Sequence, residues 1–143
     1  MSAGSPIVVI DAAALVALVA DRGDAGSWVT DTIAGAGLAA PQLAPFEAGN
    51  ILRRQAAAAL LQPAEAKLAY DDLLALPLRL VPFVALAERA WQLRPNLTIY
   101  DATYVALAEA LGVPMVTLDA RLARAAGPRC TIRAYAAPDS RAR

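Results

Sequence analysis

The chain contains the stretch Ile7-Val8-Val9-Ile10-Asp11, in which four β-branched residues are followed directly by a carboxylate. Such a run, bounded by Pro6, predicts a short strand that is buried on both faces. Asp11 then lies at the carboxyl end of that strand, which is where open α/β sheets place their chemistry. The stretch therefore predicts a central strand of a parallel sheet with an acidic residue at its functional edge.

Working outward from this strand, apolar runs of strand length alternate with longer stretches of helical character. This alternation predicts an α/β fold with a central, mostly parallel sheet of about five strands, covered by helices on both faces. We expect the last strand to lie at an edge of the sheet. The expected strands are 7–10, 38–40, 78–81, 114–118 and 131–134, and the expected helices are 12–20, 25–34, 45–61, 63–76, 84–93, 99–111 and 120–126.

Length and composition predict one domain over residues 1–143, with a core at about 7–134 and a polar tail at 138–143. No apolar run approaches the roughly 18 residues that a membrane span requires, so we expect no membrane anchor. The lone Cys130 fits a reducing cytosol, and we expect a cytoplasmic protein. The formal net charge is zero, so any polynucleotide would be held by bound metal and a few local arginines.

Three further acids stand in positions comparable to that of Asp11. Asp119 ends the strand expected at 114–118, whereas Glu47 and Asp101 open apolar helical stretches. Each acid taken singly has a purely structural interpretation as a helix cap or a first-turn acid. Together they should meet at one edge of the sheet, where their repulsion favours a bound cation. The chain has no His, so oxygen ligands predominate and the expected cofactor is Mg²⁺ or Mn²⁺.

Several neighbours of the acids are candidates for supporting roles. Asn50 and Arg54 follow Glu47 at helical spacing, so they should lie on roughly the same face; Asn50 would orient a carboxylate or a water, and Arg54 would meet a phosphate. Thr117 would donate its hydroxyl to a ligand carboxylate. Arg121 is a further candidate for substrate binding. For all of them an ordinary structural role stays open.

Two tyrosines flank Asp101, and each has two possible uses. Tyr100 and Tyr104 would either stack on a nucleic-acid base or pack in the core, and we expect core packing for at least one of them. Glu109 lies two turns beyond Asp101, and we expect it on the surface.

The order and the surroundings of the four acids resemble those of the PIN-domain ribonucleases, in particular the VapC-type toxins of bacterial toxin–antitoxin pairs. No single motif carries the resemblance, which spans residues from about 7 to 134. The matching stretches are Val9-Ile10-Asp11-Ala12-Ala13-Ala14-Leu15, Ala40-Pro41-Gln42-Leu43-Ala44-Pro45-Phe46-Glu47-Ala48-Gly49-Asn50, Leu97-Thr98-Ile99-Tyr100-Asp101-Ala102-Thr103-Tyr104-Val105-Ala106-Leu107-Ala108 and Val116-Thr117-Leu118-Asp119-Ala120-Arg121-Leu122.

The resemblance implies a three-layer α/β/α fold with an acidic Mg²⁺ or Mn²⁺ pocket. It also implies endonucleolytic cleavage of RNA, a homodimer and inhibition by a cognate antitoxin. Carried over residue by residue, it makes Asp11, Glu47, Asp101 and Asp119 the metal-site and catalytic acids, with Thr117 at the supporting hydroxyl position. The chain departs from the pattern at Pro45, which leaves the start of the Glu47 helix open.

The acids also have to be compared with the motifs of other enzyme classes. A haloacid-dehalogenase-type phosphatase needs a second Asp two residues after the first, where this chain has Ala13. A receiver domain needs a Lys after a late strand, but the only lysine, Lys67, lies between strands. No phosphate-binding glycine motif is present. Another carboxylate-metal phosphohydrolase, or a non-catalytic interaction module whose acids are only caps, stays open as an alternative.

Overall fold

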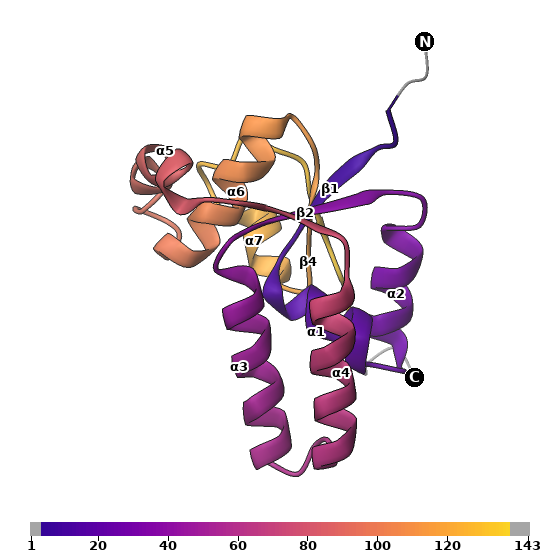
Figure 1. The fold of residues 1–143 in the computed structure, drawn as a ribbon. Coiled ribbons are helices and arrows are strands. Elements are labelled where there is room, and N and C mark those ends of the chain that lie inside the picture. The colour runs from indigo at the N-terminus through magenta and orange to yellow at the C-terminus, as the bar shows by residue number, and fades with distance from the viewer. Residues whose placement is uncertain (1–3, 138–143) are drawn as a thin grey trace.

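The sheet lies at the centre of the molecule and has five parallel strands in residues 4–137, which are the residues that the computed structural model describes. The tail expected at 138–143 lies outside them. The strand order is β3-β2-β1-β4-β5, and every strand pair is parallel; Figure 1 labels β1, β2 and β4. The expected sheet of about five strands is confirmed, with the last strand at an edge. The strands are β1 (Ile7–Ile10), β2 (Gly37–Pro41), β3 (Leu78–Val81), β4 (Met115–Thr117) and β5 (Ile132–Ala134).

Helices cover both faces of this sheet, which gives the expected three layers. Helix α1 packs against α2, α3 and α4, while α6 packs against α5 and lies on β1, β2 and β4. In Figure 1, α3 and α4 run side by side and extend away from the sheet. No helix within residues 4–137 is long and apolar enough to cross a membrane. The helices are α1 (Ala12–Ala20), α2 (Asp24–Thr32), α3 (Ala44–Ala57), α4 (Pro63–Ala75), the short 3₁₀ helix η1 (Phe83–Ala85), α5 (Ala87–Gln92), α6 (Ile99–Leu111) and α7 (Ala120–Arg124).

The core is built around β1, α1 and α6, whose sequences are almost entirely apolar. Val9 and Ile10 are fully buried, as a central strand covered on both faces requires. Helix α1 is rich in alanine, so its neighbours can approach closely. At the start of α2, a Cβ on Gly26 would come within 1.9 Å of the Asp21 carbonyl oxygen, so only glycine fits this contact.

Both ends of α6 are fixed by local chemistry. The Thr98 hydroxyl accepts a hydrogen bond from the backbone N–H of Asp101 at 3.1 Å and so caps the first turn. Gly112 has a φ of +66°, a left-handed conformation that ends the helix. The predicted bounds of α6 are confirmed for this reason. The capped N-terminus places Asp101 in the first turn of the helix.

Helices α2, α4 and α7 differ from the prediction by one or two residues at their ends, and two further helices differ more. The helix expected at 45–61 runs from 44 to 57, because the chain turns at Ala59, which has a φ of +59°. The helix expected at 84–93 is divided into η1 and α5. The break falls at Leu86, which has a φ of −113° and is buried at 3% exposure. The burial of Leu86 depends on tertiary packing, so the helical pattern of the sequence does not predict it.

Candidate functional site: an acidic edge of the sheet

The carboxyl ends of β1 and β4 lie next to each other, and an aspartate follows each strand. The two strands pair in parallel with Ile10 opposite Val116, so Asp11 and Asp119 emerge at the same edge. Asp101 comes to this region from the first turn of α6, and Glu47 comes from the first turn of α3.

Asp11 is held by hydrogen bonds to both of its carboxylate oxygens. Its Oδ1 accepts the backbone N–H of Ala14 at 2.9 Å, which makes Asp11 the N-cap of α1. Its Oδ2 accepts the hydroxyl of Thr117, and Thr117 Oγ1 accepts the backbone N–H of Asp119 at 3.0 Å. Thr117 therefore ties the end of β1 to the end of β4. The contact that the sequence suggested between Thr117 and an acid of the set is present.

Glu47 is held by a residue whose role the sequence did not reveal. The Tyr104 hydroxyl donates a hydrogen bond to Glu47 Oε1 at 2.8 Å and so joins α6 to α3. Tyr104 is 1% exposed and packs in the core as expected for one of the two tyrosines, whereas Tyr100 is 63% exposed. Spacing offered a signal, because Tyr104 lies three residues after Asp101 and therefore on the same helix face.

Asp119 has a charged partner in its own chain. Arg121 donates from Nε to Asp119 Oδ1 and from Nη2 to Oδ2, each at 3.2 Å, and its backbone N–H also reaches Oδ1 at 2.9 Å. The Arg121 side chain is 85% exposed and that of Asp119 is 35% exposed. Arg121 thus lies beside the acids, whatever its role toward a substrate.

The carboxylates at this edge have few positive charges near them, and three of the four have raised pKa values. Burial raises the pKa of Asp11 from 3.8 to about 6, against the opposing effect of its bonds to Thr117 and Ala14. Burial raises the pKa of Glu47 as well, opposed by the Tyr104 hydroxyl and supported by the charge of Asp101.

The pKa values of Asp101 and Asp119 are shifted in opposite directions. Burial and then the nearby charge of Asp119 raise the pKa of Asp101, with Thr98 and Arg121 acting in the opposite direction. The hydrogen bond from Arg121 lowers the pKa of Asp119. The acids therefore act on one another through their charges, and only Asp119 has a cation beside it in the described residues.

The donor chemistry of these acids fits a hard divalent cation. Their ligand atoms are carboxylate oxygens, which Mg²⁺ and Mn²⁺ prefer, and three of the four pKa values are raised in a way that a cation would reverse. Within residues 4–137, however, no three acids as they lie form a group tight enough to hold an ion. As they lie, Asp11, Glu47 and Asp119 each accept hydrogen bonds from donors of the protein itself.

The other two candidates make no hydrogen bond or ion pair with these acids in the described residues. Asn50 is exposed, and its Oδ1 accepts a hydrogen bond from Arg53 Nε at 2.9 Å. Arg54 is exposed on α3, and in the described residues its side chain bonds to none of the four acids. Thr117 and Arg121 thus bond acids of the set, whereas the roles expected for Asn50 and Arg54 stay predictions.

Glu109 corrects an expectation. Instead of being an idle surface charge, it is 14% exposed and accepts hydrogen bonds from Arg89 at both oxygens, with Nε–Oε1 at 2.7 Å. Its Oε2 also accepts the backbone N–H of Arg129 at 2.8 Å. These bonds join α5, α6 and the segment before β5. They lie near the C-terminal end of α6, whereas Asp101 lies in its first turn.

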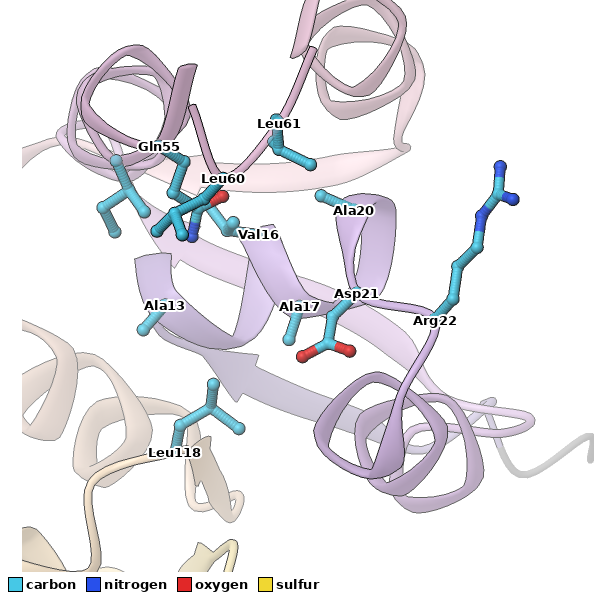
Figure 2. Close-up of a pocket in the computed structure, with 11 residues that line it drawn as sticks. Ala13, Val16, Ala17, Ala20, Asp21, Arg22, Gln55, Leu60, Leu61 and Leu118 are labelled. Carbon is cyan, nitrogen blue, oxygen red and sulfur yellow. The ribbon is translucent and has the colours of Figure 1, made fainter. Parts of the chain in front are cut away.

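A separate hollow of about 330 Å³ lies beside α1 (Figure 2). Figure 2 shows Ala13 and Leu118 at one end of it, Leu60 and Leu61 from the turn after α3 above, and Asp21 at the far end of α1. None of the four candidate acids lines it, so it is not the acidic site.

Comparison with known proteins gives the family. The model of the PIN domain family matches residues 8–128, and the chain belongs to that family. Ribonuclease VapC1 of Mycobacterium tuberculosis is 40% identical over 126 residues, which cover 87% of this chain and 95% of that protein.

Two solved structures share the fold. VapBC2 from Rickettsia felis, bound to a DNA fragment from its promoter, has a TM-score of 0.66 at 14% identity and covers 91% of this chain and 99% of its own. VapC20 of Mycobacterium tuberculosis, described as a sarcin–ricin loop cleaving toxin, has a TM-score of 0.58 at 18% identity, covering 76% of this chain and 86% of its own.

Proposed function

We propose that the protein is an endoribonuclease of the VapC type, the toxin of a toxin–antitoxin pair, which hydrolyses RNA phosphodiester bonds. One observation carries the proposal: four carboxylates from β1, α3, α6 and β4 come to one edge of the sheet in a PIN-domain chain. The 40% identity to Ribonuclease VapC1 supports the choice of RNA as the substrate. Residues from about 7 to 134 would form the nuclease as one domain around a single core.

In this proposal Asp11, Glu47, Asp101 and Asp119 hold Mg²⁺ or Mn²⁺. The cation would supply the positive charge that offsets the phosphate and the developing charge of hydrolysis. The chain's own donors prepare the ligands, since Thr117 orients Asp11 and Tyr104 orients Glu47. The sequence has no histidine, so a carboxylate would take the proton from the attacking water.

We also propose that the protein is a homodimer and binds a cognate antitoxin. The described surface carries large apolar side chains on α3 and α4, where Phe46 is 81%, Leu74 58% and Tyr70 41% exposed. Together with Pro45 they line a groove between the two helices. A mean hydropathy of +0.45 adds to the argument that a second copy or a partner covers such surface.

The experiment is cleavage of single-stranded and structured RNA by the purified protein. We expect cleavage with Mg²⁺ or Mn²⁺, complete loss in excess EDTA, and a loss of about 100-fold or more for Asp101→Asn, since a positioned charge in a metal site is worth several kcal/mol. Asp72→Asn, on the exposed face of α4, is the matched control and should cleave like the wild type. Cleavage that persists in EDTA would contradict the metal mechanism, and absence of cleavage under all conditions would favour an interaction module.

A further inference from the structure

Arg121 makes a contact with Asp119 that a bound cation would have to break or share. Its guanidinium reaches both carboxylate oxygens, with Nε–Oδ1 and Nη2–Oδ2 each at 3.2 Å. This two-pronged pairing uses the same lone pairs that a metal ligand offers. The backbone N–H of Arg121 also bonds Oδ1, so Asp119 is the most heavily engaged acid of the set.

Two of the other acids at this edge, Asp11 and Glu47, have neutral partners. Asp11 accepts bonds from the Thr117 hydroxyl and the Ala14 N–H, and Glu47 accepts one from the Tyr104 hydroxyl. Hydroxyls and amides can keep their bonds while a carboxylate also binds a cation, because they carry no net charge. A guanidinium repels the cation directly. Arg121 is therefore the group at this edge that opposes metal loading.

The pairing is also easy to release. The Arg121 side chain is 85% exposed, and within the described residues its guanidinium bonds only Asp119. Exposed ion pairs of this kind are weak, because water screens them and holding a long side chain costs entropy. A divalent cation carries twice the charge and would displace the guanidinium. The freed side chain would then stand beside a site that binds an anionic substrate.

We propose that Arg121 is a positioning residue with two successive partners: it is the internal counter-ion of Asp119 without metal, and it turns to an RNA phosphate when a cation takes Asp119. Metal loading and RNA binding would thus be coupled through one side chain. Arginine suits both roles because its planar fork matches a carboxylate and a phosphate equally well. The RNA half of this inference rests on the proposed function, whereas the competition for Asp119 does not.

The competition is tested by calorimetric titration with Mn²⁺ in the absence of RNA. Arg121→Gln should bind Mn²⁺ about two- to fivefold more tightly than the wild type, the factor that corresponds to an exposed ion pair. Arg124→Gln is the matched control, since Arg124 lies on the same helix and acts on Asp119 by charge without bonding it. Unchanged or weaker binding by Arg121→Gln, or an equal gain in Arg124→Gln, would overturn the inference. Melts in EDTA verify that both variants fold.

The release is tested by fluorescence anisotropy with a labelled single-stranded RNA, checked for intactness after each titration. In Ca²⁺, a hard cation with oxygen ligands, Arg121→Gln should bind RNA several-fold more weakly than Arg124→Gln. In EDTA, Arg121→Gln should show no such deficit, because Arg121 is then engaged with Asp119. A deficit of equal size in EDTA, or none in Ca²⁺, would overturn the release. If Mn²⁺ binding behaves as expected but the wild type cleaves no RNA, the proposed function fails and the competition stands.

Discussion

Asp11 is a carboxylate that is 8% exposed and lacks a positive partner among the described residues. Such a group usually shares its burial with a basic side chain, because an unpaired buried charge is costly. Here the cost is expressed as a pKa raised from 3.8 to about 6 by burial. The folded protein therefore holds a proton on Asp11 more strongly than the unfolded chain does. Without a cation, Asp11 opposes folding at neutral pH.

The first prediction is that Asp11→Asn stabilises the metal-free protein at pH 7.5. Because the folded pKa is raised, the stability of the wild type falls as pH rises between about 4 and 6, and the neutral variant avoids this loss. The shift corresponds to at most about 3 kcal/mol. The amide nitrogen replaces one acceptor oxygen and disturbs the Thr117 bond, so we expect a gain of about 1–2 kcal/mol. Urea melts in EDTA from pH 4 to 8 measure it.

Asp119→Asn is the control, because the pKa of Asp119 is shifted in the opposite direction to that of Asp11. Arg121 lowers the pKa of Asp119, so its charge favours folding above the unfolded pKa and the benefit is lost as pH falls. The control should therefore gain nothing at pH 7.5. Equal melts for Asp11→Asn and the wild type across the whole pH range would contradict the account of Asp11.

At the scale of single elements, caps explain which boundaries the sequence could predict. Asp11, Thr98 and Gly112 each stop or start a helix through a local hydrogen bond or a local backbone conformation, and α1 and α6 begin and end where predicted. The break between η1 and α5 has no such cap; it falls at Leu86, which is buried. The same division applies to Glu109. Helical spacing predicts that Glu109 lies on α6, but it does not predict the partner of Glu109, because Arg89 is twenty residues away in the sequence.

The second prediction concerns the bonds between Arg89 and Glu109, which fasten α5 to α6. Burial tends to raise the pKa of Glu109, but the bonds from Arg89 and Arg129 outweigh it and lower that pKa overall. Glu109→Gln should cost about 1–3 kcal/mol at pH 7, the typical loss when a charged bond is removed from a largely buried pair. The loss should shrink as pH falls through the pKa of Glu109. Thermal melts at pH 7 and pH 4 measure it.

Glu88→Gln provides the comparison, because Glu88 is exposed in the first turn of α5. It should change stability by only a few tenths of a kcal/mol. Amide hydrogen exchange adds a local readout: in Glu109→Gln the amides of α5 should exchange faster, while those of β1 keep their protection. Uniform loss of protection would argue against a local role for these bonds.

For the whole molecule, the sequence predicted that β1 and β4 end at the same edge of the sheet, but it did not predict every bond that the acids there make. Parallel topology alone brings the ends of β1 and β4 to one edge, so the sequence is enough to place Asp11 and Asp119 at that edge. The sequence suggested the Thr117 donor, whereas the donor to Glu47 comes from a pairing between distant elements. Tyr104 reaches Glu47 across 57 positions, which no local pattern encodes. Arg121 was expected to bind substrate, yet its hydrogen-bond partner in the described residues is the neighbouring Asp119.

The third prediction is that Mg²⁺ raises the melting temperature of the wild type. A ligand that binds only the folded state stabilises it by RT ln(1 + [L]/Kd), about 2.7 kcal/mol at 100 times Kd, or about 5–10 °C for a chain of this size. Asp101→Asn should lose most of this rise while keeping or gaining stability in EDTA. Asp72→Asn should respond like the wild type. Identical melting temperatures with and without saturating Mg²⁺ would contradict a metal site and would favour the interpretation of the acids as helix caps.

The strand order has a consequence for the synthesis of this protein. β1 is the central strand and is made early, but its neighbour β4 begins only at Met115. At roughly 5–20 residues per second, several seconds pass between the translation of Asp11 and that of Asp119. Throughout that interval a nascent chain has one side of β1 unpaired and lacks the last proposed ligand. A chain of this topology therefore cannot assemble its proposed acidic site until Asp119 has been translated.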